Sequence, residues 1–294
     1  MAMRIGVDGG ATKTEFILIN AAGEVVGRHL DAGCNPNVSG KERAIQIVSD
    51  GLRQLRAQAG EPIELTLICM AGHRPFWSEF AKNLSEFGNC GASDDSLPVL
   101  ELATGGKPGL VMHAGTGSFV AARGRDGKAY YAGGLGWRFG DEGRGFDLGK
   151  RAIARAYLEV QGWARPSAVG ELVKAAVPGD PTTILARYYQ DPAPNPSIAA
   201  FAPQILTLAE KNDPVAQSIV DDSVSGLADL AAKVSATLFP GAAKGAIPVG
   251  LSGPIVNHPA SARILGAHRS LKFTTITGSP AEGLRRMLVR GALT

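Results

Sequence analysis

The chain has 294 residues, 45% of them hydrophobic and 19% charged, which excludes a disordered protein and predicts two globular domains. The net charge is +3 with scattered Lys and Arg, and no apolar run could span a bilayer, so we expect neither nucleic acid nor a membrane as partner. Three widely spaced cysteines without a metal-binding pattern are typical of reduced thiols, so we expect a cytoplasmic protein.

The first predicted element is a hairpin, in which apolar residues 5–7 and 16–19 flank a polar turn. The turn carries Asp8, Gly9, Gly10, Thr12, Lys13 and Thr14. Such a set suits a polyphosphate, because glycines let backbone N–H groups approach, hydroxyls and lysine donate, and a carboxylate holds Mg²⁺. The spacing fits neither a Walker A loop nor a dinucleotide fingerprint, and an ordinary hairpin with a polar tip is the alternative.

A third strand is expected at residues 24–30, followed by a loop and a helix over residues 41–59 that Ser39 would cap. Asn35 in this loop precedes a proline, which favours extended backbone and would leave the Asn35 amide free to face a ligand. A plain Asx turn is the alternative.

Residues 63–70 predict a buried parallel strand, and residues 75–87 a helix after it. A short strand over residues 90–93 then ends at Asp94 and Asp95, before a helix over residues 96–103. Paired carboxylates at such a junction can be a helix cap, an exposed charge pair or a catalytic base.

A second hairpin repeats the first, with strands at residues 110–114 and 119–122 around Gly115, Thr116, Gly117 and Ser118. Two glycine-rich hairpins about a hundred residues apart indicate a duplicated fold in which each half contributes a phosphate clamp.

Residues 133–145 are the densest glycine run in the chain and include Gly136, Asp141 and Glu142 before a helix over residues 146–160. Such a loop could bind a polyhydroxylated ligand, or be a mobile loop with a helix cap. The remaining pattern is helical from 168 to 238, with breaks at 178–183 and 190–196. It then gives a strand ending at Ser252-Gly253, a strand at 273–277 and a last helix over 280–291.

Taken in order, these motifs resemble the N-acetylglucosamine kinase and BadF/BadG-type branch of the sugar kinase, actin and Hsp70 superfamily. The resemblance implies an α/β fold of two ribonuclease-H-like domains, as in actin-like ATPases, with a nucleotide cleft between them. The first domain would cover residues 1–112 and be completed by the C-terminal helix 280–294, and the second would cover residues 113–279.

The resemblance also implies the roles of individual residues. Nucleotide contacts would come from Gly9, Gly10, Thr12, Lys13, Thr14, Gly115, Thr116, Gly117, Ser252 and Gly253. Sugar contacts would come from Asn35, Thr116, Gly136 and Asp141, the catalytic base would be Asp95, and Asp8 would hold Mg²⁺. Leu135 departs from the pattern, because relatives commonly carry Trp there, and this bears on the N-acetyl pocket.

The implied activity is phosphorylation of an amino-sugar hydroxyl by ATP, on N-acetylglucosamine (to the 6-phosphate) or glucosamine, with a homodimer as a conceivable assembly. Asp95 is preferred to Asp94 as base, because neighbouring side chains at a strand end point to opposite sides and only Asp95 keeps the family's distance to residues 104–106. The alternative activity is an ATPase that activates a partner protein, as dehydratase activators do through cysteine-bound iron–sulfur clusters.

Overall fold

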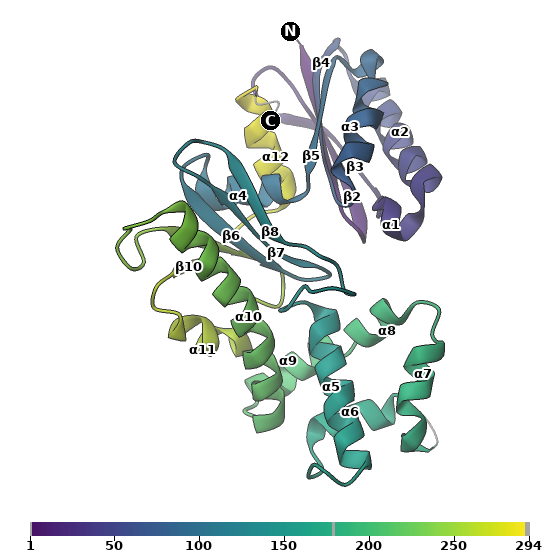
Figure 1. Cartoon of the computed structure of the whole chain (residues 1–294). Coiled ribbons are helices and arrows are strands. Elements are labelled where there is room, and N and C mark those ends of the chain that lie inside the picture. The colour runs from purple at the N-terminus through teal and green to yellow at the C-terminus, as the bar shows by residue number, and fades with distance from the viewer. Residues whose placement is uncertain (1, 178–179, 292–294) are drawn as a thin grey trace. The chain divides into compact units, whose positions relative to one another are not determined.

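A computed structural model describes residues 2–177 and 180–291 and divides into two compact units (Figure 1). The first unit comprises Met1–Gly106 and Ile276–Thr294, and the second comprises Lys107–Thr275. A boundary after residue 112 would cut strand β6 (Gly109–Ala114), all of whose residues pair with the next strand of the second unit. The units therefore divide before this strand rather than within it.

The first unit is built on a five-stranded sheet with the order β3-β2-β1-β4-β5. Its strands are β1 (Met3–Gly9), β2 (Lys13–Ile19), β3 (Val25–Ala32), β4 (Ile63–Met70) and β5 (Asn89–Asp94). The first three strands are antiparallel neighbours, whereas β1, β4 and β5 run parallel. Gly9 pairs with Met70 and Met70 with Asp94, so Asp8 and the Asp94–Asp95 junction lie at the same carboxyl edge of the sheet.

Helices cover both faces of this sheet. They are α1 (Pro36–Ser39), α2 (Lys41–Gln58), α3 (Arg74–Lys82), α4 (Ser96–Thr104) and α12 (Pro280–Val289), with a 3₁₀ turn at Ser85–Phe87. Figure 1 shows α2 and α3 on one face and α4 with α12 on the other. The expected Ser39 cap was wrong, because Gly40 occupies the N-cap position at φ 81° while the Ser39 hydroxyl donates to the Asn35 carbonyl.

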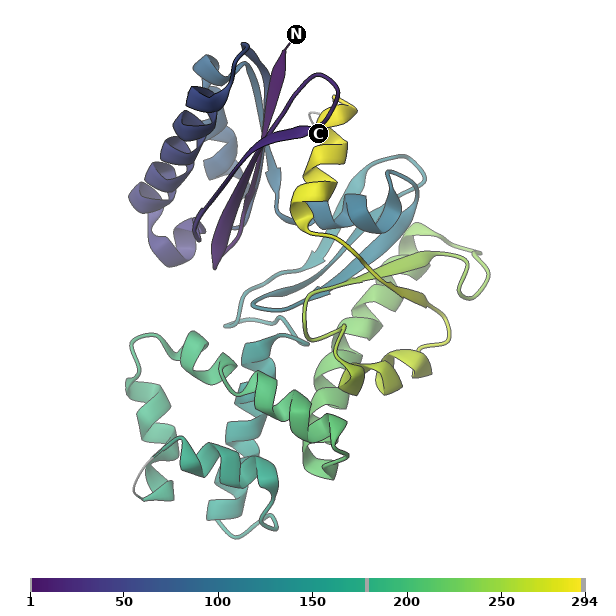
Figure 2. The same cartoon turned by 180° about the vertical axis from the view of Figure 1, so that it is seen from behind.

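The C-terminal helix α12 is part of the first unit's core and lies against β1 and α4 (Figure 2). A Cβ at Gly6 of β1 would lie 2.7 Å from Leu284 of α12, so the missing side chain lets the helix approach. Arg4 donates to the Leu288 carbonyl over 2.8 Å, and Arg290 pairs with the buried Glu101 of α4.

The second unit has the sheet order β10-β9-β6-β7-β8. Besides β6, its strands are β7 (Ser118–Arg123), β8 (Ala129–Gly133), β9 (Pro248–Ser252) and β10 (Lys272–Thr275). The β6, β7 and β8 strands are antiparallel neighbours, and β6, β9 and β10 are parallel, as in the first sheet. The duplicated α/β fold is therefore confirmed, although β8 was not expected.

Helices between β8 and β9 make up much of the second unit. They are α5 (Gly145–Val160), α6 (Ala168–Ala175), α7 (Ile184–Gln190), α8 (Pro194–Ala199), α9 (Ala202–Glu210) and α10 (Pro214–Leu238), with a 3₁₀ turn at Pro181–Thr183; α11 (Pro259–Ala267) follows β9. Of the expected break at 178–183, residues 178–179 lie outside the described residues. The α10 helix packs on β6 and β7 and buries Val220, Val224 and Leu227.

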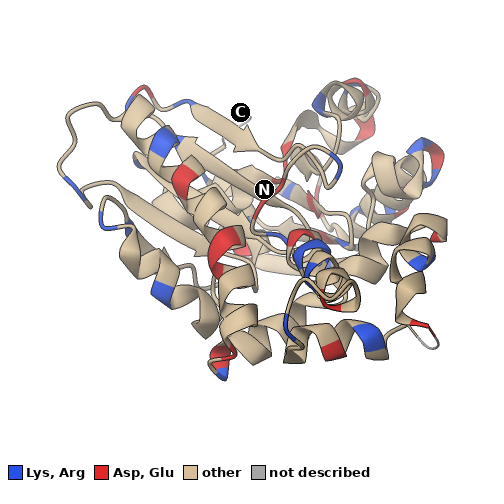
Figure 3. Cartoon of the chain, turned by 60° about the horizontal axis from the view of Figure 1, so that its bottom comes forward, with Lys and Arg blue, Asp and Glu red and all other residues tan. Residues whose placement is uncertain are grey.

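Charged side chains of both signs are interspersed over the elements of each unit (Figure 3). In the described ranges, 2–177 and 180–291, no helix combines the length and apolar character needed to cross a bilayer.

Two helical glycines give a matched test of the α12 packing. A Cβ on Gly283 of α12 would overlap the Pro98 carbonyl oxygen, whereas a Cβ on Gly266 of α11 would meet no described atom within 4 Å. We expect Gly283→Ala to lower the free energy of unfolding by about 2 kcal/mol, as overpacking does. Gly266→Ala should raise it by up to about 1 kcal/mol, the helix propensity of alanine over glycine. Chemical denaturation that ranks the two variants in the reverse order would show that α12 does not pack tightly on α4.

Candidate active site

The turn between β1 and β2 is closed by backbone hydrogen bonds and backed by buried side chains. The Gly10 N–H donates to the Lys13 carbonyl over 2.9 Å, and the Gly10 carbonyl accepts from Cys34 over 3.1 Å. A Cβ at Gly9 would lie 2.5 Å from Met70 and 2.6 Å from Cys34, so only glycine fits. Thr12 and Lys13 are exposed at the turn, and the Lys13 ammonium lies 3.7 Å from the Glu15 carboxylate.

Thr14 differs from its expected role as a phosphate donor. Its side chain is fully buried, and its hydroxyl donates to the Ala32 carbonyl of β3 over 2.7 Å. Since the one hydroxyl hydrogen is already used, Thr14 stabilises the β2–β3 pairing, and we leave it out of the phosphate donors that we propose below.

Two carboxylates with raised pKa values lie at the carboxyl edge of the first sheet. Burial, followed by the charges of Asp95 and Glu15, raises the pKa of Asp8 to about 7, against the opposing charge of Lys13. Burial and the neighbouring Asp94 likewise raise the pKa of Asp95 to about 6. Because buried carboxylates that repel one another are costly to ionise, such a pair is suited to binding a cation or to transferring a proton.

The neighbours Asp94 and Asp95 have different surroundings. An Asp94 carboxylate oxygen accepts from the Ser96 backbone N–H over 3.1 Å and also from the Ser96 hydroxyl. Asp95 occupies the N-cap position of α4 but, within the described chain, its side chain makes no capping hydrogen bond. Asp94 therefore stabilises the start of α4, whereas the Asp95 side chain makes no such contact within the described chain.

Asn35, the expected sugar contact, caps α1. Its side-chain oxygen accepts from the Asn37 backbone N–H over 3.0 Å, so its amide nitrogen is the atom left to donate. The sequence left an Asx turn and a ligand contact as alternatives for Asn35. The structure is compatible with both, because the oxygen makes the turn and the amide nitrogen can still donate to a ligand.

The donor set fits magnesium better than a protein-caged metal. Among the described residues, no group of three or more His, Cys, Asp or Glu side chains surrounds a common point. Mg²⁺ keeps several waters and binds through one or two carboxylates and substrate phosphates, and Asp8 is a carboxylate of the kind that this coordination needs.

In the second unit, the glycine-rich β6–β7 turn is likewise closed by a backbone hydrogen bond from a glycine, although over two residues rather than three. The Gly115 N–H donates to the Gly117 carbonyl over 2.8 Å, and the Gly115 carbonyl accepts from Gly145 at the start of α5 over 3.1 Å. Thr116 at the tip is exposed. The Ser118 hydroxyl donates to the Glu142 carbonyl over 2.6 Å and so ties this turn to the glycine-rich loop.

Asp141 organises that glycine-rich loop. It has a left-handed backbone at φ 64°, and one carboxylate oxygen accepts from the Gly136 N–H over 3.1 Å. The other oxygen pairs with Arg144 over 3.1 Å, and both side chains are almost fully buried. The two expected sugar contacts, Gly136 and Asp141, are thus brought together by a hydrogen bond.

Ser252 and Gly253 lie at the end of β9, beside β6. The Ser252 hydroxyl is 3.0 Å from Nδ1 of His113, whose ring stacks on Phe119 at 4.9 Å between centroids. Gly253 has φ 92°, and a Cβ there would overlap the Ala114 carbonyl. Burial lowers the pKa of His113 to about 4, so this histidine is neutral near pH 7.

Comparison with known proteins assigns the chain to a family. A model described as the BadF/BadG/BcrA/BcrD ATPase family matches residues 5–265. The chain belongs to this family.

Relatives of this family member include two curated sugar kinases. An N-acetylmuramic acid/N-acetylglucosamine kinase of Clostridium acetobutylicum is 27% identical over 160 residues, and the chain spans about half of its length (52%). An N-acetyl-D-glucosamine kinase of Dictyostelium discoideum is 26% identical over 246 residues, 77% of each chain. A solved structure from Chromobacterium violaceum, named provisionally as an N-acetylglucosamine kinase, superposes with a TM-score of 0.76 at 26% identity, over 98% of this chain and 99% of that one.

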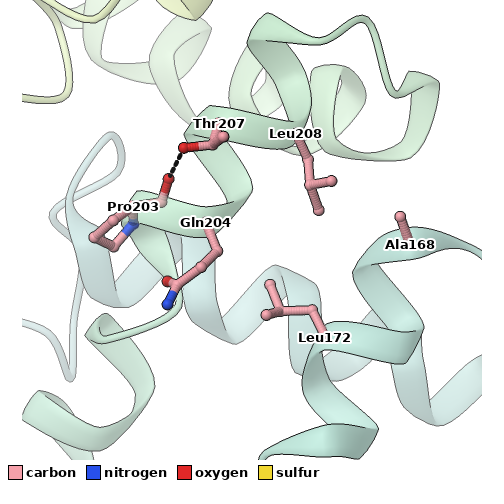
Figure 4. Close-up of a pocket in the computed structure, with 6 residues that line it drawn as sticks. All are labelled: Ala168, Leu172, Pro203, Gln204, Thr207 and Leu208. Carbon is pink, nitrogen blue, oxygen red and sulfur yellow. Dashed lines mark hydrogen bonds between the residues drawn. The ribbon is translucent and has the colours of Figure 1, made fainter.

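The fold expected from the resemblance, two actin-like ATPase domains, is therefore confirmed for this member of the BadF/BadG/BcrA/BcrD family. A groove of about 490 Å³ in the helical part of the second unit contains none of the expected site residues (Figure 4). It is lined by Ala168, Leu172, Pro203, Gln204, Thr207 and Leu208. Because these side chains offer no ionisable group, the groove is no candidate for phosphoryl transfer.

Sequence reasoning did not single out two residues of this family member that contact candidate site residues: His113, which lies beside Ser252, and Arg144, which pairs with Asp141. His113 lies within an apolar strand, where a histidine is typical of a packed core. Arg144 lies between two glycines and three residues after Asp141, and this short spacing was the available signal, because a cation so close along the chain could have been paired with the Asp141 carboxylate.

The second turn allows a test of nucleotide binding without damage to the fold. No described side-chain or backbone atom comes closer than 4.0 Å to a Cβ built on Gly117. We expect Gly117→Val to fold normally but to weaken ATP affinity by about 2 kcal/mol, the value of a lost charge-assisted contact. Calorimetry with Mg-ATP measures this, with Gly60→Val as control, because a Cβ on Gly60 also meets no described atom within 4 Å. Equal affinity in the Gly117 variant and the wild type would remove this turn from the nucleotide site.

Proposed function

We propose that the chain is an ATP-dependent kinase that phosphorylates a hydroxyl of an amino sugar, N-acetylglucosamine to its 6-phosphate or glucosamine. The observation that carries this proposal is the carboxylate of Asp95, which stands without a capping partner in the described chain beside Asp8 and has a pKa raised to about 6. The names of the two curated relatives support the substrate class.

Phosphoryl transfer needs alignment and charge neutralisation more than covalent help. Asp95, ionised above its pKa, would accept the proton of the sugar hydroxyl and aim the oxygen. Asn35, Gly136, Thr116 and Asp141 would hold the sugar. Phosphate contacts would come from the backbone of Gly9, Gly10, Gly115 and Gly117 and the side chains of Thr12, Lys13 and Thr116, with Ser252 and Gly253 beside the nucleoside.

Asp8 would hold Mg²⁺, and the ion would supply charge neutralisation on the phosphate oxygens. Burial and nearby carboxylates raise the pKa of Asp8, so ionising this side chain is costly in the protein alone. A bound cation would offset that cost and lower the pKa again, and Asp8 therefore fits this role.

The competing activity, an ATPase that activates a partner through an iron–sulfur cluster, is less well supported. Cys34 and Cys69 are buried, and burial raises the pKa of both thiols, which disfavours the thiolate form that binds a cluster. A cytoplasmic location and a homodimer belong to the kinase proposal as well.

A coupled assay of ADP release with N-acetylglucosamine, glucosamine, N-acetylmuramic acid and glucose tests the function. We expect an amino sugar to raise turnover well above the rate with ATP alone, and the sugar phosphate to appear in equal amount. ATP hydrolysis that no sugar stimulates would favour the partner-activating ATPase.

A further inference from the structure

Arg144 is a buried cation with two different partners. It occupies the N-cap position of α5, and its side chain is only 5% exposed. One terminal nitrogen donates to the Asp141 carboxylate over 3.1 Å, and the other donates to the Asn195 side-chain oxygen of α8 over 3.2 Å. The third nitrogen, Nε, is buried without a hydrogen-bond partner among the described residues.

This arrangement is costly for a purely structural contact. Burial lowers the pKa of Arg144 although Asp141 counteracts it, so the surroundings disfavour the charge. Replacing a buried ion pair by apolar residues is often neutral or stabilising, so the pair is weak evidence for stability. The buried Arg144–Asp141 pair is therefore better explained by a role in positioning the Asp141 carboxylate.

The pair lies where a ligand contact is expected. The Asp141 oxygen that accepts from Arg144 is also the atom closest to a Cβ built on Gly117, at 4.0 Å. The second Asp141 oxygen is taken by Gly136, the other expected sugar contact of this loop. A planar guanidinium fixes a carboxylate more rigidly than an ammonium does, because its donors have a fixed fork geometry.

We propose that Arg144 is the positioning residue of the sugar site: it fixes the Asp141 carboxylate in the orientation that binds the sugar and ties it to α8 through Asn195. This inference rests on the proposed kinase function. Arg144 acts through Asp141 and does not itself touch the reacting atoms. Asn195 restrains the second terminal nitrogen of the Arg144 guanidinium, so replacing Asn195 should disturb the Asp141 carboxylate in the same way but less.

The test measures sugar KM, ATP KM and kcat for Arg144→Met, Arg144→Lys, Asn195→Leu and the wild type. We expect Arg144→Met to raise the sugar KM about tenfold or more, as the loss of a charge-assisted contact does, with the ATP KM unchanged. Arg144→Lys should recover part of this effect. Asn195→Leu should raise the sugar KM less.

A double-mutant cycle separates positioning from a merely structural role. If Arg144 acts through Asp141, Arg144→Met should add nothing to the sugar KM in an Asp141→Asn background. Arg155→Met is the matched control, because Arg155 lies on the same helix and pairs with the buried Glu159 over 3.2 Å. It should lower thermal stability and leave the sugar KM unchanged.

The outcomes are distinct. A sugar-active wild type whose sugar KM is unchanged by Arg144→Met, or additive effects in the cycle, would overturn the positioning role and leave the kinase function standing. A wild type that phosphorylates no sugar would overturn both. If Arg144→Met fails to fold, Arg144→Lys takes its place in the cycle with Asp141→Asn. Non-additive effects of these two substitutions on the sugar KM would support the positioning role, and additive effects would overturn it.

Discussion

Replacing Asp95 by asparagine should lower kcat by roughly 100-fold or more, the usual value of a positioned general base. Asparagine keeps the size and polarity of the side chain but cannot accept a proton. Because Asp95 makes no capping bond within the described chain, its replacement should leave the start of α4 intact. The KM values for sugar and ATP should change far less than kcat.

Asp94→Asn is the matched control for this prediction. One Asp94 oxygen accepts from both the Ser96 N–H and the Ser96 hydroxyl, and the asparagine carbonyl oxygen has the two lone pairs needed to accept both, although without the negative charge. We therefore expect near-normal kcat and a small loss of stability. An inactive Asp94→Asn beside an active Asp95→Asn would shift the assignment by one residue, and full activity in both would move the base elsewhere.

Asp8→Asn should abolish most activity while stabilising the nucleotide-free protein at pH 8. The folded protein holds the Asp8 proton up to a pKa of about 7, whereas an unfolded chain loses it near the ordinary value of 3.8. The stability cost of ionising Asp8 therefore grows as the pH rises from 3.8 and is complete above 7. Asparagine removes this cost, which we place on the order of 2 kcal/mol because Asp8 as a whole residue is half-buried rather than fully buried.

Urea denaturation at several pH values, together with kcat/KM, tests both parts. The gain in the free energy of unfolding should be largest at pH 8 and shrink toward pH 4, and kcat/KM should fall by roughly 100-fold or more because a charge-stabilising group is lost. Asp50→Asn, at an exposed pair on α2, should change neither quantity by much. A destabilised Asp8→Asn at pH 8 would mean that Asp8 is held by favourable contacts rather than by repulsion.

The parts of this molecule that follow local rules could be predicted from its sequence. Gly9-Gly10 and Gly115–Gly117 interrupt apolar runs, which identified both hairpins and the duplication. The β8 strand was missed because it is a largely exposed edge strand with little apolar alternation. The expected helix over 75–87 ends at Lys82, where Asn83 donates back to the Glu79 carbonyl.

The candidate site was harder to predict where a side chain's role depends on tertiary neighbours. Thr14 has the right chemistry for a phosphate donor, but β3 takes up its hydroxyl. Asp141 was identified, yet the two contacts of Arg144 were not: the Asp141–Arg144 pair is local, but its burial is not visible in the sequence, and the Arg144–Asn195 contact joins segments 51 residues apart. Burial of a charge is a property of the assembled fold rather than of the local pattern.

The docking of α12 on the first unit has a consequence for synthesis on the ribosome. The first unit begins with β1 but is completed only by residues 280–289, after the whole second unit has been translated. Domains tend to fold as they emerge, so the later-made unit can finish first, while the face of β1 at Gly6 waits uncovered for its helix. During that interval the nascent chain exposes apolar sheet surface, and chaperone binding should be strongest before the last helix leaves the exit tunnel.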